Sequence, residues 1–183
     1  ARIGRVPMLM LSEVRLLEAE GQYRCAAGVG APNFTGVATA CAGSFVTASN
    51  LVNVSRTAGM VGGVATGGGL PAAPNDAVTL VSGGAACVPK IPVAPSYTTL
   101  QCGNLWEALK YEKRIETAYT GFAPWWLDGR GWGDLPEGTP LFLPVPYQEL
   151  QARNRPITAL YGTGQGIGTA PNSVTTAKGN YGW

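Results

Sequence analysis

The stretch GNLWEALKYEKRIETAYT, residues 103–120, carries the strongest helix signal in the chain and decides the fold class. Its apolar residues recur with the 3.6-residue period of an amphipathic helix. The predicted apolar face, which continues past the end of the helix, consists of Leu105, Ala108, Ile115, Tyr119 and Phe122. The charged residues are expected to be solvated or ion-paired elsewhere on the helix: Glu112, Lys113, Arg114 and Glu116. Gly121 is expected to end the helix.

Two further helices are predicted on the N-terminal side of this stretch. Residues 8–24 form the first, and four residues share one of its faces: Met10, Val14, Leu17 and Gly21. Residues 42–58 form the second, with Phe45, Ala48 and Val52 on one face and Gly59 as a natural C-cap. The Ser, Thr and Asn residues of this second segment lower its helix propensity.

The segments around these helices are rich in Gly and Pro. Residues 59–102 are interrupted too often for a helix interior, and AVTLV, residues 77–81, is predicted as a short strand. LFLPVP, residues 141–146, is predicted as a short strand or a buried extended segment. After residue 150 the chain has few large apolar residues and cannot form a core by itself.

The four cysteines predict two disulfides, Cys25 to Cys41 and Cys87 to Cys102. Each pair closes a loop of about 15 residues, for which the loss of chain entropy on cross-linking is worth about 3 kcal/mol. Free buried thiols and the other pairings stay open as alternatives. Disulfides indicate an oxidising compartment: the periplasm, the cell surface or secretion. No CxxC pair is present, so zinc is not expected.

Composition argues against several classes of function. The chain has no histidine, which removes the commonest general base and metal ligand. A net charge of +2 with 13% charged residues gives no footprint for nucleic acid. No apolar run approaches the roughly 18 residues needed to span a bilayer. GTGQGIG, residues 162–168, opens no helix and is not expected to bind a dinucleotide.

An enzyme is therefore not expected, nor is a metal or a cofactor. The local carboxylates that a glycosidase would need are Glu112, Glu116, Asp128 and Asp134. Glu112 and Glu116 have Lys110, Lys113 or Arg114 close by in the sequence, which is typical of ordinary helix salt bridges.

Four segments in a fixed order resemble the C-terminal part of the SusD/RagB family. They are LSEVRLLEAEGQYR (11–24), LVNVSRTAG (51–59), EKRIETAYTG (112–121) and PWWLDGRGWGDLPEGTPLFLPVPYQEL (124–150). Thr117, Thr120 and Gly129 depart from the family pattern, and the 59–102 insertion is atypical. Members of this family are longer, surface-exposed outer-membrane lipoproteins that capture nutrients for a TonB-dependent transporter. The resemblance leaves two alternatives open: a fragment of a longer protein, or a shortened relative that keeps only a docking role.

The resemblance places the aromatic loop WWLDGRGW, residues 125–132, against the 103–120 helix. Within it, Trp126 and Trp132 are predicted to be core, as is Trp106 of the helix itself. Trp125 is predicted to be exposed, as a partner or ligand contact, with structural and binding roles equally open. Asp128 and Arg130 are expected to pair with Arg114 or Glu116.

Residues 1–150 are thus expected to form a mainly α domain of tetratricopeptide-like helix pairs with long, irregular, disulfide-stapled loops. Residues 151–183 are expected to form an extended C-terminal arm. Its Tyr181 and Trp183 are predicted to contact a partner, unless the arm packs on its own domain.

The predicted function is that of a non-enzymatic accessory or structural subunit outside the cytoplasm. We expect it to dock on a larger membrane protein complex without spanning the membrane itself. A transporter and a photosynthetic or respiratory assembly both fit this expectation. The alternative is capture of a glycan or nutrient for a TonB-dependent transporter in the outer membrane.

Overall fold

The computed structural model describes residues 10–28, 41–58, 60–61, 64–65, 69–93, 96, 98–118, 124–132 and 147–154. This part of the chain is mainly helical, as the sequence predicts. The chain divides into two compact units. The first comprises Ala1–Ile91 and Leu100–Phe122, and the second comprises Pro92–Thr99 and Ala123–Trp183.

All three predicted helices are present in the first unit: α1 (Leu11–Ala26), α2 (Phe45–Arg56) and α3 (Leu105–Glu116). The starts of α2 and α3 are fixed by capping side chains that satisfy free amide groups of the first turn. Ser44 Oγ accepts a hydrogen bond from the Thr47 amide, and Asn104 Oδ1 accepts from the amides of Trp106 and Glu107. The predicted end signals Gly59 and Gly121 lie outside the described residues.

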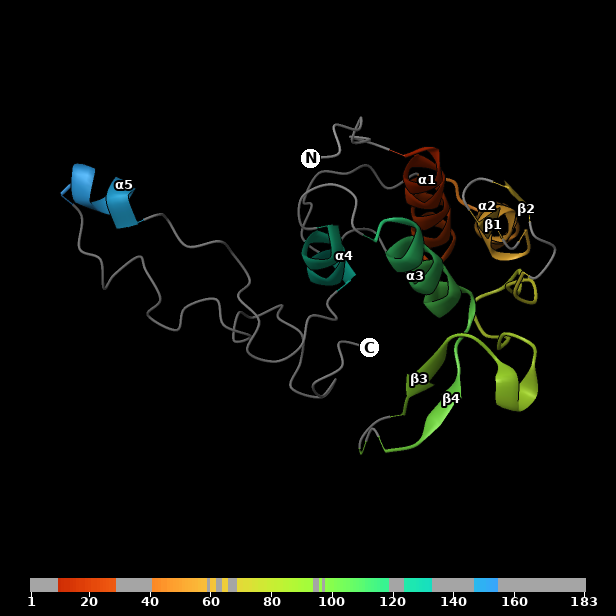
Figure 1. Cartoon of the computed structure of the whole chain (residues 1–183). Helices are drawn as coiled ribbons and strands as arrows, with labels where there is room; N and C mark the ends of the chain where they lie inside the picture. Colours follow the sequence, from red (N-terminus) through yellow and green to blue (C-terminus); the bar gives the residue numbers. More distant parts are fainter. Residues whose placement is uncertain are drawn as a thin grey trace. The chain divides into compact units, whose positions relative to one another are not determined.

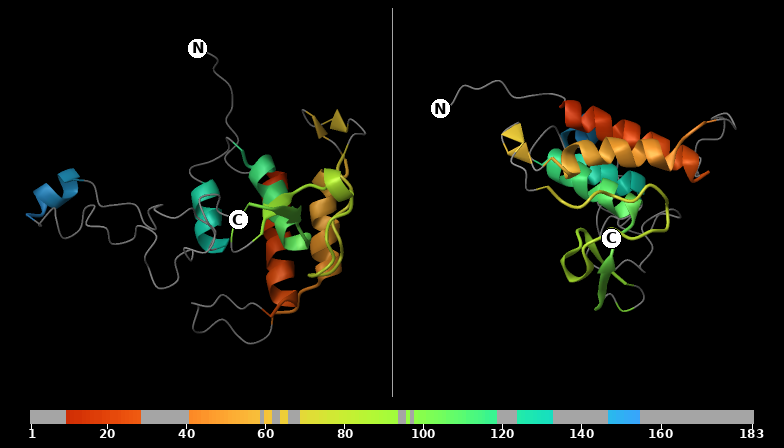
Figure 2. Two further views of the ribbon diagram at one scale, coloured as in Figure 1. Left: turned by 90° about the horizontal axis from the view of Figure 1, so that it is seen from below. Right: turned by 90° about the vertical axis from the view of Figure 1, so that its right-hand side faces the viewer.

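The three helices pack on one another in every pairwise combination (Figures 1 and 2). Tyr23, near the end of α1, contacts Phe45 at the start of α2 and Trp106 at the start of α3. α1 therefore runs opposite to the other two helices. The core between the helices is formed by Leu16, Ala19, Ala48, Val52, Leu105, Ala108 and Leu109.

The predicted faces of α2 and α3 are largely those that pack. Ala48 and Val52 are fully buried, as are Leu105 and Ala108. The prediction for Ile115 is wrong, because this side chain is exposed. The buried side of α3 continues instead through Glu112 and Lys113, whose charges find partners on the neighbouring helices. Tyr119 and Phe122 lie outside the described residues.

The helical period predicted for α1 is correct, but the predicted apolar face is not the face that packs in the core. Val14, Leu17 and Gly21 are exposed, whereas Leu16 and Ala19 are fully buried. α1 carries apolar residues on two opposite faces, so periodicity does not decide between them. The face that packs carries Leu16 and the small Ala19. The face with Val14, Leu17 and Gly21 is exposed.

An irregular segment, residues 69–91, runs across these helices and contains one 3₁₀ turn, η1 (Gly84–Ala86). The predicted strand at 77–81 does not form. The Asp76 carboxylate accepts hydrogen bonds from the amides of Val78 and Thr79, which bends the chain there. The Val81 amide then donates to the Gly103 carbonyl.

Two short pairs of strands lie at the two ends of this segment. β1 (Met60–Val61) pairs antiparallel with β2 (Val64–Ala65), with Met60 opposite Ala65. β3 (Lys90–Pro92) pairs with β4 (Leu100–Cys102). The Gly/Pro-rich insertion thus forms short extended pieces rather than a helix.

Both predicted disulfides are confirmed. Cys25, in the last turn of α1, is bonded to Cys41, with the two Cα atoms 5.4 Å apart. Cys87 is bonded to Cys102, with the Cα atoms 5.8 Å apart. Each bond lies just before an N-capped helix, the first before α2 and the second before α3.

The second unit contains α4 (Pro124–Trp132) and α5 (Tyr147–Ala152). The predicted aromatic loop is therefore a helix. Pro124 occupies its first position, where the missing amide hydrogen costs no hydrogen bond. α5 crosses the predicted boundary at residue 150, and residues 141–146 lie outside the described part of the chain. Among the described residues, no helix is long and apolar enough to cross a membrane.

Candidate functional site

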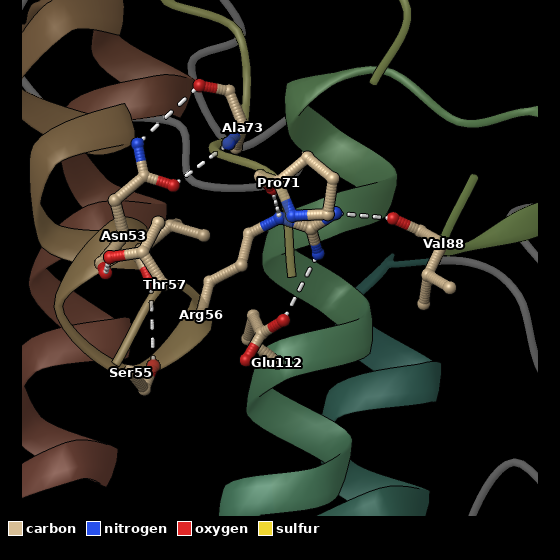
Figure 3. Close-up of polar contacts among 9 residues, drawn as sticks. Asn53, Ser55, Arg56, Thr57, Pro71, Ala73, Val88 and Glu112 are labelled. Atoms are coloured by element: carbon tan, nitrogen blue, oxygen red, sulfur yellow. Dashed lines mark hydrogen bonds and ion pairs between the residues drawn. The ribbon is translucent and has the colours of Figure 1, made fainter. Parts of the chain in front are cut away.

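The most elaborate polar contacts of the first unit gather around Arg56, at the end of α2. This side chain is only 2% exposed. Its Nη1 atom lies 3.0 Å from Glu112 Oε1 on α3, and its Nε atom donates to the Pro71 carbonyl at 2.7 Å. Nη2 donates to the Val88 carbonyl. Figure 3 shows the guanidinium between α3 and the two ends of the irregular segment.

Asn53, one turn before Arg56, binds the same segment with its amide. Its Oδ1 accepts from the Ala73 amide at 2.8 Å, and its Nδ2 donates to the Ala73 carbonyl at 3.4 Å (Figure 3). Ser49 Oγ also donates to the Ala73 carbonyl, at 2.9 Å. We call the side chains Ser49, Asn53, Arg56 and Glu112 the Arg56 cluster. Together they hold the main chain of residues 71–88 on α2 and α3.

The close fit at the end of α2 depends on a glycine. A Cβ atom on Gly69 would lie 2.1 Å from the Thr57 carbonyl oxygen, which is not tolerated. The next amide, that of Leu70, donates to the Arg56 carbonyl at 2.8 Å. The chain therefore turns directly across the helix end into the irregular segment.

The electrostatics of the Arg56 cluster are those of a buried ion pair. Burial raises the pKa of the Glu112 carboxyl above its ordinary value. The positive charge of Arg56 lowers this pKa but does not outweigh the effect of removing the carboxyl from water. The negative charge of Glu116 raises the pKa by a smaller amount. Charges in such a pair stay buried only because each has partners within hydrogen-bonding distance.

A second set of ion pairs lies between α1 and α3. Glu20 on α1 contacts Lys113 on α3 at 3.0 Å and Arg24 on its own helix at 2.9 Å. Glu107 contacts Lys110 at 2.9 Å within α3. Both lysines are buried, and Lys113 is ion-paired, which is one of the two alternatives expected for the charges of this helix.

An aromatic junction joins the ends of the three helices. The Tyr23 ring lies 5.2 Å from the Phe45 ring and 4.9 Å from the Trp106 ring, between centroids. The Arg24 guanidinium lies 5.1 Å from the centre of the Trp106 ring, in cation–π range. Trp106 is partly buried against the core, as predicted for a structural residue. Burial, followed by the charge of Glu107, raises the pKa of the Tyr23 hydroxyl.

The charged side chains at these sites hold structural elements together. Each of the three carboxylates Glu20, Glu107 and Glu112 lies within about 3 Å of a cation, at the distances given above. Each of them therefore has a structural role. Within the described residues, no group of three or more Cys, Asp or Glu side chains is arranged to hold a metal ion.

The aromatic residues predicted as contacts or core lie mainly in the second unit. Trp125 on α4 is 56% exposed, as predicted for a contact residue. Trp126 and Trp132 are partly buried, so the structure does not place them in a fully enclosed core. Tyr181 and Trp183 lie outside the described residues. The pairing of Asp128 and Arg130 with α3 stays a prediction.

Sequence reasoning missed the Arg56 cluster, although a signal for it was present. Arg56 follows Val52 by four residues on the predicted apolar face of α2. A cation on the face that packs predicts a buried partner, because an isolated buried charge is very costly. The partner, Glu112, is 56 residues away, and nothing local in the sequence identifies it.

Comparisons with known proteins add no assignment to this geometry, and the resemblance to the SusD/RagB family stays a prediction. No family model matches the chain, and searches among curated proteins and solved structures found no relative or fold neighbour.

Proposed function

We propose that the chain is a non-enzymatic subunit that acts outside the cytoplasm and docks on a larger membrane protein complex. The observation that carries this proposal is the exposure of large apolar side chains on α4, Trp125 above all. Trp125 and Leu127 are 56% and 55% exposed on this helix. Tryptophan is enriched among the residues that dominate binding energies at protein interfaces.

The arrangement of charges in the first unit supports a role without catalysis. Glu112, Glu107 and Glu20 are tied to Arg56, Lys110 and Lys113, in pairs that hold helices or loops together. An acid–base residue needs access to a substrate proton, and a carboxylate buried in a structural ion pair lacks it.

The disulfides support the location. The bonds Cys25–Cys41 and Cys87–Cys102 are typical of chains that fold in an oxidising compartment. The periplasm or the outer-membrane surface is the finer location that we propose. We also propose that the antiparallel pair α1–α2 is a tetratricopeptide-like helix pair, in keeping with the SusD/RagB resemblance.

Glycan or nutrient capture is the second candidate, and Trp125 is also the observation that favours it. An exposed indole offers a flat apolar face on which a sugar ring can stack. The two functions differ in what covers this ring: a protein partner in the first and a carbohydrate in the second.

Native mass spectrometry after mild detergent extraction of the source membrane tests the proposal. We expect the chain in fixed stoichiometry with a larger complex, and Trp125→Ser should release it. Ile115→Ser is the matched control, because Ile115 on α3 is also 56% exposed and should leave the complex intact.

Recovery of the chain without partners would contradict the docking function. A carbohydrate screen with tryptophan fluorescence as the readout would then decide on the second candidate. A fluorescence change that saturates with one glycan and disappears in Trp125→Ser would establish capture.

A further inference from the structure

The outer face of α1 is apolar and lies opposite the face that packs in the core. Leu11, Val14 and Leu17 are 73%, 44% and 47% exposed. They follow one another at intervals of three residues, which keeps them on one side of a helix. Gly21 lies on this side as well and is also exposed. We call these four residues the outer face of α1; Glu18 and Arg15 lie on the side of this face that carries Leu11.

Gly21 is not explained by the packing of a single chain. A helix is less stable with glycine than with alanine in its interior, because glycine leaves the unfolded chain more conformational freedom to lose. At Gly21 an added Cβ atom would meet no other atom within 4 Å, so no close approach within the chain requires a glycine. An open position of this kind suits a helix whose neighbour comes from another molecule.

The charges on the flank of this face form no ion pair with any residue that the structure describes. In the described residues the side chains of Arg15 and Glu18 take part in no ion pair, whereas Glu20, Glu107 and Glu112 all do. At 100° per residue, Glu18 falls between Val14 and Leu11, and Arg15 lies 60° from Glu18, beyond Leu11, so both charges are on the flank that carries Leu11.

We propose that the outer face of α1 binds the same face of a second copy of this chain, with the two helices antiparallel. A twofold axis near residue 16 places Leu11 of each copy at the same level along the helix as Gly21 of the other. It also brings like flanks together, because rotation about such an axis keeps each flank on its own side. Arg15 of each copy then lies within one residue's rise of Glu18 of the other.

The second copy is favoured over an unrelated protein because the face is complementary to itself. The most exposed apolar side chain of this face, Leu11, lies level with the position that has no side chain, Gly21. The one free cation of this flank meets the one free anion, twice by symmetry, within the described residues. A single pair of helices buries less than the roughly 1,200–2,000 Å² of a standard interface, so we expect a weak, concentration-dependent dimer.

A charge exchange tests this geometry. Sedimentation velocity of the full chain over a range of concentrations should show a monomer–dimer equilibrium. Arg15→Glu and Glu18→Arg each place like charges in contact and should weaken the dimer by more than about tenfold. The double variant R15E/E18R restores opposite charges across the interface and should dimerise like the original chain.

Two further variants separate assembly from folding. Gly21→Leu fills the open position, so it should abolish dimerisation while the monomer keeps or gains thermal stability. Leu17→Ser should also weaken the dimer. The controls are Val54→Ser on α2, whose side chain is 48% exposed, and Lys90→Glu on β3, which should change nothing.

A chain that stays monomeric at every concentration would overturn the proposal, as would a dimer that R15E and G21L leave unchanged. A dimer that both single charge variants weaken and R15E/E18R fails to restore would equally contradict the antiparallel register. These results do not depend on the membrane complex, because the measurement uses the chain alone.

Discussion

The three helices and the irregular segment 69–91 belong to the same unit but are held by different forces. Between α1, α2 and α3 the contacts are mainly apolar side chains such as Leu16, Val52 and Leu109. In the irregular segment the main-chain carbonyls and amides are bound by side chains of the Arg56 cluster. If one apolar contact is lost, neighbouring side chains of the helices can repack around it. A main-chain carbonyl of the segment that loses its hydrogen-bond donor has no second donor to replace it.

This difference explains how a segment so rich in Gly and Pro has a defined course. It contributes only three side chains to the core: Ala73, Val81 and Cys87. Hydrogen bonds from a rigid helix provide the remaining constraints, and a disulfide closes its far end. Substitutions that act on one type of contact and not on the other test this division.

The largest effect is expected for Arg56→Met. It leaves Glu112 without its counter-charge and the carbonyls of Pro71 and Val88 without a donor, which costs about 3–5 kcal/mol of stability. Hydrogen exchange should show that the amides of residues 70–81 lose protection first. Leu109→Ala, a core cavity with a cost of about 2–5 kcal/mol, should instead weaken the helices and the segment together. Equal exchange profiles for the two variants would contradict the division.

The same variant should acquire a characteristic pH dependence. The folded-state pKa of Glu112 is raised, so its contribution to stability is largest below the unfolded pKa and declines as the pH rises through the folded pKa. Without Arg56 this pKa rises further, and the deficit of Arg56→Met should shrink as the pH falls from 7 toward 4.5. R56M/E112M should have a smaller deficit at pH 7, and its own stability should lack the pH dependence that Glu112 contributes. Urea unfolding at several pH values measures this.

Removal of either disulfide should lower the free energy of unfolding by a similar amount, but the two removals should loosen different parts of the chain. Each closes a loop of similar length, so the loss of chain entropy gives about 3 kcal/mol for both. C87A/C102A should release the irregular segment and β3–β4, whereas C25A/C41A should loosen the ends of α1 and α2. Hydrogen exchange on the two double variants checks the location. A global loss of protection in both would show that the two regions unfold as one.

Asn53→Ala should have an intermediate effect. It leaves the buried amide of Ala73 without an acceptor, which costs about 1–3 kcal/mol. Asn50→Ala is the control, because Asn50 is exposed on the same helix and should be neutral or slightly stabilising. Thermal unfolding of both variants gives the comparison, and equal melting temperatures would remove Asn53 from the cluster.

The smallest effect is expected at Asp76, which is partly exposed. Hydrogen bonds lower the pKa of its carboxyl: first those from the backbone and the side chain of Thr79, and then one from the backbone of Val78. Its contribution is therefore present above the unfolded pKa and is lost as the pH falls through the folded pKa. Asp76→Ala should lower the melting temperature slightly at pH 7 and not at all in strong acid. Asp76→Asn keeps an acceptor and should lose only the pH dependence.

The sequence predicts most of the helical part of the fold because helix signals are local. The period of Leu105 and Ala108, the capping residues and the spacing of the cysteines all lie within one or two turns or one loop. α1 shows the limit of periodicity, because Leu11, Val14 and Leu17 form as good a stripe as the residues that pack. The choice between two apolar faces is made by neighbours that are distant in sequence.

The Arg56 cluster and α4 could not be derived in the same way. Glu112 looked like one of several surface charges on α3, and its burial depends on a partner 56 residues away. In α4, Gly129 and Gly131 lower the helix propensity, and Pro124 read as the continuation of a loop. Trp125 was predicted correctly as exposed because neighbouring side chains diverge in a helix as well as in an extended chain.

The bond between Cys25 and Cys41 makes the α1–α2 connection useful for protein engineering. It fixes the two ends of the connection with Cα atoms 5.4 Å apart, independently of the residues between them. A foreign peptide inserted between these two cysteines would become part of a covalently closed ring that is attached to two helices. Because each doubling of loop length costs only about 0.6 kcal/mol, the scaffold should accept inserts of very different length.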